Sequence, residues 1–244
     1  MHRSVAHFAP EAGVGRVGQK KIIMDAKIWE TWLNDWKWVQ SCMKRKKCEV
    51  HDLVLEDPMS SSAIQSIKNK LSIVLPAEFV RVVTTFASGV SFLWYIEDDE
   101  KRPPAPYSDI FSGGADALWD AERLVACKET YDGWIKECFS DPSDPYDKVW
   151  HDKTPFLEVP NGDLIAFDVT AGDRNCPVVY LSHDDGELHG SRLGADFVDF
   201  VSRWSHLGCP GPEEWQIQPF HDSSTDNLLK SGPLVENWRK WLAD

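Results

Sequence analysis

The chain has 244 residues, of which 42% are hydrophobic and 27% charged, and its formal net charge is −13. This composition is typical of a globular protein that is long enough to bury a core without metal or disulfide support. No stretch approaches 18 apolar residues and residues 1–23 lack an apolar segment, so neither a membrane span nor a signal peptide is predicted. We expect residues 1–23 to form a disordered tail, and the pattern leaves Met24 open as the true start.

The first predicted element is an amphipathic helix over residues 25–47, within a Trp-rich extension that covers residues 24–57. Its Trp residues recur at helical spacing and leave one apolar face. After a break, Ser62 and Gln65 form a capping-box pattern that predicts a second helix. Pro76 suits the first turn of a third helix, which Gly89 is expected to end.

The middle of the chain alternates between strand and helix signals. Residues 92–96 are a compact apolar run and predict a strand, followed by a charged, Pro-rich loop over 97–106. Residues 115–139 predict another helical region. Residues 141–147, with two Pro and three Asp, predict a surface loop.

The clearest β signal lies in residues 156–169, where Asn161-Gly162 separates two apolar runs and predicts a hairpin. Residues 178–181 are expected to pair as the next strand. A helix over 197–204 stops at Gly208 and Pro210, and residues 234–242 predict a short helix that Trp238 and Trp241 dock onto the body.

This order contains no regular β–α alternation, which disfavours a parallel sheet. We therefore predict an α+β fold with an antiparallel (mixed) sheet meander and helices packed on one side. The expected organisation is a tail (1–23), a helical extension (24–57), a central domain (58–210) and a C-terminal extension with a docking helix (211–244).

The negative charge is concentrated between Glu97 and Glu187, where about 22 acidic residues face about 8 basic ones. Such a field repels nucleic acid and anionic lipid and favours a basic protein partner. The alternative interpretation is an acidic surface that serves solubility. The six cysteines show no C-x-x-C motif and no zinc-ligand spacing, which indicates reduced thiols and a cytoplasmic location.

No enzyme motif stands out from the sequence. A metal site would draw on His183, Asp184, Asp185 and His189, but these residues lie in a Gly-containing turn without standard ligand spacing, so a solvated turn is favoured. Paired carboxylates would draw on Asp163, Asp168 and Asp173, which lie in a turn, a strand and a loop with no reason to converge. We therefore predict no catalytic residue, no metal and no cofactor.

Several segments in shared order resemble the SMI1/KNR4, or SUKH, family. They are Leu75-Pro76-Ala77-Glu78-Phe79 with Ser88-Gly89, the run from Phe156 through Gly162-Asp163 to Asp168, Val178 to His183-Asp184, and the closing helix that ends at Trp204. The resemblance covers roughly residues 60–206, and the ending Asn237-Trp238-Arg239-Lys240-Trp241-Leu242 also looks like that of bacterial members. It implies a SUKH-like fold and a non-catalytic binding module. Bacterial members look like immunity proteins that block secreted toxins, often nucleases, whereas fungal members look like regulators.

The resemblance and the charge together predict a protein partner, such as a basic toxin domain. An acidic surface can occupy the basic face with which a nuclease holds its substrate. Candidate contact residues are Glu97, Asp98, Asp99, Glu100, Asp184 and Asp185, with Trp94 and Trp119 as aromatic anchors. Each has a plainer alternative, a solvated loop acid or a core aromatic. Two other functions stay open: an intracellular regulatory scaffold, and an unrecognised hydrolase or metal protein.

Overall fold

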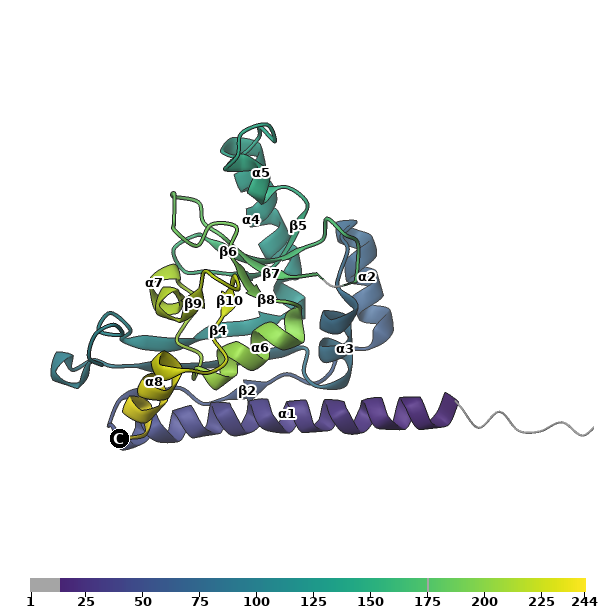
Figure 1. Ribbon diagram of the computed structural model, residues 1–244. Coiled ribbons are helices and arrows are strands. Elements are labelled where there is room, and N and C mark those ends of the chain that lie inside the picture. The colour runs from purple at the N-terminus through teal and green to yellow at the C-terminus, as the bar shows by residue number, and fades with distance from the viewer. Residues whose placement is uncertain (1–13, 175) are drawn as a thin grey trace, which may run out of the picture.

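The computed structural model describes residues 14–174 and 176–244, with side chains from Met24 onward. Residues 1–13 of the expected tail lie outside this range. Helix α1 (Val14–Arg45) begins before residue 25, where the apolar periodicity predicts its start. It runs along the base of the molecule in Figure 1.

The Trp stripe of α1 forms one wall of the main core. Trp32 and Trp36 are fully buried, and Trp29 is nearly so. The indole of Trp32 donates to Ser202 Oγ and that of Trp36 to Ser205 Oγ, both at 2.9 Å. The helical spacing read from the sequence therefore places these rings on one buried face. The helix of the Trp-rich extension therefore packs against helix α6 (Phe197–His206).

A first antiparallel sheet lies above α1. Its central strand β3 (Gly89–Tyr95) pairs with β4 (Ser112–Asp120) on one side and with two short strands, β1 (Glu49–Val50) and β2 (Val54–Leu55), on the other. Alternate residues of β3 are buried and partly exposed. One face of this sheet therefore belongs to the core, while the other keeps some contact with solvent.

Strand β4 corrects the prediction of a helix over residues 115–120. The pairing of β4 with β3 is irregular between Val90 and Phe92, so Leu118 and Trp119 are both buried although they are neighbours. Two neighbouring buried residues break the period of two expected for a strand, so the apolar pattern of this segment resembles that of a helix. The helix itself, α4 (Leu124–Glu137), begins only after a short 3₁₀ turn.

Two cap predictions are also corrected. Helix α2 (Ser61–Leu71) is capped by Ser60, whose hydroxyl accepts from the amide of Ala63 at 3.2 Å, rather than by Ser62. Helix α3 (Ala77–Thr85) ends at the cap residue Phe86, and Gly89 begins β3 instead of ending the helix. Pro76 precedes α3 as its N-cap residue.

The second antiparallel sheet is a meander in chain order, and the sequence predicts its first three strands but not its fourth. Its strands are β5 (Lys153–Glu158), β6 (Leu164–Asp168), β7 (Val178–Leu181) and β8 (Arg192–Gly194). The turn between β5 and β6 contains Gly162 with φ +100°, a conformation that favours glycine. The Asn-Gly hairpin prediction is therefore confirmed.

Helices cover both faces of this second sheet, whereas the sequence analysis expected them on one side. Ile165 and Phe167 of β6 belong to the main core with α3 and α6. Leu164 and Ala166 point the other way, into a second apolar cluster with Tyr131 of α4. Because side chains alternate along a strand, a fully apolar strand such as β6 has to be covered twice. The α+β class with antiparallel sheets is confirmed.

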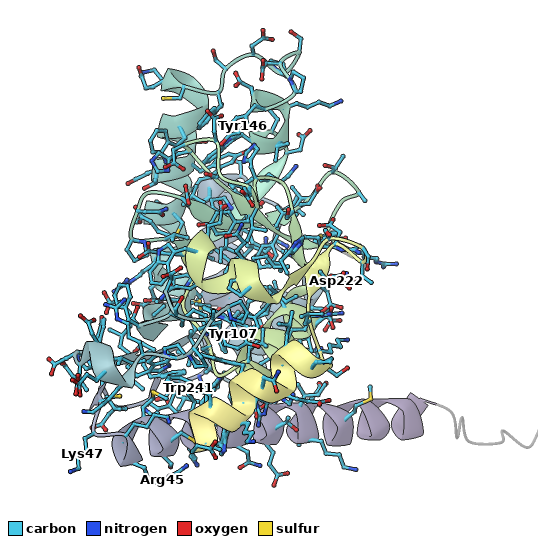
Figure 2. All side chains as sticks on the ribbon, turned by 60° about the vertical axis from the view of Figure 1, so that its left-hand side comes forward. Arg45, Lys47, Tyr107, Tyr146, Asp222 and Trp241 are labelled. Atoms are coloured by element: carbon cyan, nitrogen blue, oxygen red, sulfur yellow. The ribbon has the colours of Figure 1, made fainter. Side chains whose placement is uncertain are left out.

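The C-terminal residues return to the end of α1. Helix α8 (Pro233–Ala243) buries Trp238, whose indole donates to the carbonyl of Leu207 at 2.6 Å. Figure 2 shows Trp241 of α8 close to the end of α1, where Arg45 donates to the carbonyl of Ala243 at 3.1 Å. The docking role predicted for the two Trp residues fits this arrangement, with Trp241 stacked on Trp238.

The remaining elements are short. They are α5 (Asp147–Trp150), α7 (Glu214–Ile217), the 3₁₀ turns η1 (Asp99–Lys101), η2 (Ala121–Arg123) and η3 (Gln218–Phe220), and the strand pair β9 (His221–Asp222) and β10 (Asn227–Leu228). Within residues 14–174 and 176–244, no helix combines the length and the apolar character needed to traverse a lipid bilayer.

Candidate functional site

The first predicted contact region is the loop between β3 and β4. Glu97, Asp98, Asp99 and Glu100 are all exposed, and Figure 1 shows this hairpin reaching away from the body. Two of the four charges are compensated locally, because Lys101 lies 3.5 Å from Asp98 and Arg102 lies 2.8 Å from Asp99. In the part of the chain that the structure describes, Glu97 and Glu100 have no ion pair.

The second predicted region is the loop after β7, where Asp184 and Asp185 are exposed. Asp184 accepts a hydrogen bond from Ser182 Oγ at 2.9 Å, and the amide of Asp185 donates to the hydroxyl of Tyr146 at 3.0 Å. Asp185 has φ +64°, so its side chain projects from a tight turn. The two acidic regions belong to different sheets and form no contact with each other among the described hydrogen bonds and ion pairs.

The two predicted aromatic anchors are core residues. Trp94 and Trp119 are fully buried, and the indole of Trp119 donates to the carbonyl of Ala87 at 3.0 Å. A side chain with no exposed surface has nothing to offer a partner, so this prediction is corrected. Sequence alone does not separate the two roles, because a large aromatic in a strand serves either a core or an interface.

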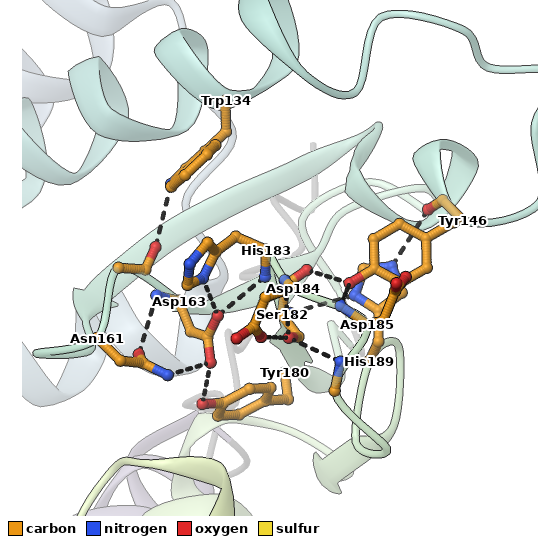
Figure 3. Close-up of polar contacts among 12 residues, drawn as sticks. Trp134, Tyr146, Asn161, Asp163, Tyr180, Ser182, His183, Asp184, Asp185 and His189 are labelled. Atoms are coloured by element: carbon orange, nitrogen blue, oxygen red, sulfur yellow. Dashed lines mark hydrogen bonds and ion pairs between the residues drawn. The ribbon is translucent and has the colours of Figure 1, made fainter.

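Behind the second acidic loop lies a buried polar cluster around Asp163 (Figure 3). Asp163 Oδ1 accepts from the backbone amide of His183 at 2.9 Å and lies 2.6 Å from His183 Nδ1. Asp163 Oδ2 accepts from the hydroxyl of Tyr180 at 2.6 Å and from Asn161 Nδ2 at 2.8 Å. Burial opposes ionisation of this carboxyl, but the hydrogen bonds from Tyr180, His183 and Asn161 outweigh it and lower the pKa of Asp163.

The other groups in this cluster are also fixed. His183 packs against Trp134 with the ring centroids 4.9 Å apart and the ring planes tilted by 31°. The indole of Trp134 donates to the carbonyl of Gly162 at 3.0 Å. His189 lies with Nδ1 3.1 Å from the amide of Ser182 and Nε2 3.1 Å from the carbonyl of Tyr146, so it is held as the neutral tautomer with hydrogen on Nε2. Burial lowers the pKa of His189.

A metal-like grouping exists here, but its ligand atoms already have partners. One ligand atom each from Asp163, His183 and Asp184 lie within 4.8 Å of one another. Both oxygens of Asp163 hold two hydrogen-bond donors each, which leaves no lone pair directed at an ion. His189, part of the grouping considered from sequence, uses both ring nitrogens elsewhere. The cluster therefore anchors the β5–β6 turn to the loop after β7.

The remaining carboxylates considered from sequence have separate surroundings. Asp168 accepts from Thr170 Oγ1 at 2.6 Å and pairs with Lys153 at 3.6 Å. Burial of Asp168 is outweighed by these contacts, which lower its pKa. Asp173 is exposed, in the loop after β6. Neither has a contact to Asp163 among the described polar interactions, so the described side chains do not assemble the acid–base pair of a glycosidase.

A groove that sequence reasoning missed opens between β4 and β5. Its volume is about 550 Å³. The apolar lining includes Leu93, Phe111, Ala117, Ala126, Leu157, Val159 and Trp215. The acidic side chains of the lining are Asp116, Asp120, Glu158 and Glu213, and the basic one is Arg123. The sequence predicts a helix over residues 115–120, which offers no strand edge, whereas the structure has strand β4 there.

The groove begins where the acidic β3–β4 loop ends. Tyr95 and Phe111, which flank that loop, both line the groove, and the amide of Ile96 donates to the carbonyl of Phe111 at 2.7 Å. Phe111 is 37% exposed and stacks on Trp215 with ring centroids 5.0 Å apart. These partly exposed rings, rather than Trp94 and Trp119, are the aromatics that a partner can reach.

The two antiparallel sheets and their helices define an α+β protein. The chain belongs to the SMI1/KNR4 family (SUKH-1), whose family model matches residues 58–203. Comparison with curated proteins and with solved structures finds no match. Family membership supports a SUKH-type immunity or binding protein in general. The match begins at the residue where the sequence analysis placed the start of the central domain, and it ends within α6.

Proposed function

We propose that this chain is a non-catalytic, cytoplasmic immunity protein that neutralises a basic toxin domain by binding it, with a nuclease as the toxin that its charge suits best. The supporting observation is the exposed acidic surface that no ion pair compensates within the described chain. It includes Glu97 and Glu100 on the β3–β4 loop and Asp184 and Asp185 on the loop after β7. A nuclease holds a polyanion, so its substrate face carries the opposite charge.

Three further observations support the proposal. Members of the family are generally non-catalytic immunity proteins. Asp163 and Asp168, two of the carboxylates considered for acid–base catalysis, are engaged in structural hydrogen bonds. All six cysteines are free, and four of them are buried, which suits a reducing compartment.

The test is direct binding to the proteins encoded in the neighbouring reading frames, measured by biolayer interferometry at low and at moderate salt. We expect one of them to bind, with an association rate that falls as salt rises, because electrostatic steering acts mainly on association. If no neighbouring protein binds, or if binding is insensitive to salt, the immunity role is refuted. Binding to several unrelated partners instead would favour a regulatory scaffold.

A charge-reversal pair locates the contribution of the acidic loop. Replacing Glu97 and Glu100 by Lys should slow association about tenfold and reduce its salt dependence, since rim charges act on encounter. The matched control replaces Glu129 and Glu236 by Lys, because both are exposed and lie outside the acidic loop and the groove lining. Equal effects of the two pairs would show that only net charge matters and would remove the loop from the interface.

A further inference from the structure

The groove between β4 and β5 is bounded by two strands that do not pair with each other. β4 pairs with β3, and β5 pairs with β6, and the two strands belong to different sheets. β4 has a strand partner only on its β3 side and β5 only on its β6 side, so among the described residues each of the two strands keeps one edge without a strand partner. Strand edges of this kind accept an added extended segment through backbone hydrogen bonds.

The start of β4 shows that this edge already accepts backbone partners. The amide of Gly114 donates to the carbonyl of Cys209 at 2.7 Å, and Gln216 Nε2 donates to the carbonyl of Ser112 at 2.9 Å. These contacts occupy only the beginning of the strand. The groove lining continues to Ala117. Among the described backbone hydrogen bonds, none joins Ala117 to a later segment of the chain.

The charges on the groove select a basic occupant. Arg123 lies 3.5 Å from Asp120, so that pair is internally compensated. Asp116, Glu158 and Glu213 have no ion pair among the described residues, and Asp116 and Glu158 are exposed. An occupant therefore meets an apolar floor and a negative rim, and only a segment with both apolar and cationic side chains satisfies them together.

We infer that this groove binds an extended segment of the partner in which apolar side chains alternate with Lys or Arg. An extended chain points successive side chains to opposite sides, so one set fills the apolar floor and the other reaches the carboxylates of Asp116 and Glu158. A volume of about 550 Å³ lies within the range of sites that enclose a ligand. The inference rests on the proposed function as a protein-binding module and adds which part of a partner it takes.

The first experiment is a selection of random octapeptides displayed on phage against the purified full-length chain. We expect the enriched peptides to alternate Lys or Arg with apolar residues. Replacing Asp116 and Glu158 by Lys should shift the enriched peptides toward Glu and Asp at the same alternate positions. Selection of no peptide, or of peptides without basic residues, would overturn the inference.

The second experiment blocks the groove without touching the core. Ala126 is exposed on α4 and lines the groove, so Ala126→Trp fills it from the surface. We expect this variant to raise the Kd of the best selected peptide at least tenfold, measured by fluorescence anisotropy. The matched control is Gly133→Trp, because Gly133 is exposed on the same helix, has open space around it and lies outside the groove lining. Circular dichroism checks that both variants are folded.

The outcomes separate the groove from the immunity role. If a neighbouring gene product binds the native chain and the Ala126→Trp variant equally well, the groove is not used and the inference fails while the proposed function stands. If peptide binding is lost in the variant but no neighbouring protein binds, the immunity role fails while the groove stands. Sedimentation of the chain adds a further outcome: a dimer that Ala126→Trp converts to a monomer would assign the groove to a second copy and overturn the inference.

Discussion

The buried carboxylate of Asp163 joins the β5–β6 turn to the loop after β7, so its removal should destabilise the second sheet. Asp163 is 1% exposed and accepts four hydrogen bonds. Asp163→Ala leaves the hydroxyl of Tyr180 and the amide of His183 without an acceptor, and each unsatisfied buried donor costs about 1–3 kcal/mol. We expect a total loss of about 3–5 kcal/mol in the free energy of unfolding, the range found when a buried charged partner is removed.

The effect should depend on pH in a defined direction. The hydrogen bonds lower the pKa of Asp163 in the folded protein, whereas an unfolded Asp titrates near about 3.9. A lowered folded pKa stabilises the protein fully above the unfolded value, and this contribution is lost as the pH falls through the folded value. The difference between native protein and variant should therefore be constant from about pH 7 to about pH 5 and shrink below about pH 4.

The assay is urea unfolding followed by Trp fluorescence at several pH values. Tyr180→Phe, which removes only one of the four bonds, should cost about 1–1.5 kcal/mol. Asp109→Ala is the control, because Asp109 is exposed and should stay within about 0.5 kcal/mol of the native protein. A loss below about 1 kcal/mol for Asp163→Ala, or a loss that does not change at low pH, would refute the structural role given to this carboxylate.

Three other changes follow from single positions and are measured as free energies of unfolding. Gly114→Ala should cost more than about 2 kcal/mol, because Gly114 has φ +76° and an added Cβ would collide with the carbonyl of Phe92. Gly133→Ala, in open space on α4, should gain about 0.5–1 kcal/mol. Equal effects of the two substitutions would contradict the close approach of Phe92 to Gly114. Trp119→Ala should cost about 3–5 kcal/mol as a core residue; lost partner binding at unchanged stability would return Trp119 to the interface. Burial lowers the pKa of His189, so the folded protein holds the neutral imidazole and loses free energy of unfolding as the pH falls below about 6.5. His189→Asn should make this loss less steep. An unchanged dependence of the free energy of unfolding on pH would argue against that burial.

The sequence by itself determined the local elements whose signal lies within a few residues. The Asn161-Gly162 hairpin, the first three strands of the meander and the amphipathic α6 all follow from short-range pattern and turn chemistry, and the structure has each of them. The shared order of such motifs also sufficed for the family, which the match over residues 58–203 confirms. The exposed position of the loop acids at Glu97 and Asp184 was readable as well, because charged, turn-rich segments stay in solvent.

Only the tertiary structure decided which large side chains are core and where a surface is hollow. Trp119 lies in β4 and Phe111 directly before it, yet one is fully buried and the other 37% exposed. Trp119 packs against Trp32 and Trp36 of the distant helix α1, whereas Phe111 stacks on the partly exposed Trp215. The groove exists because β4 and β5, far apart in the chain, end up side by side without pairing. Local pattern carries no information on such long-range placement, since each strand satisfies its own periodicity whichever neighbour it meets.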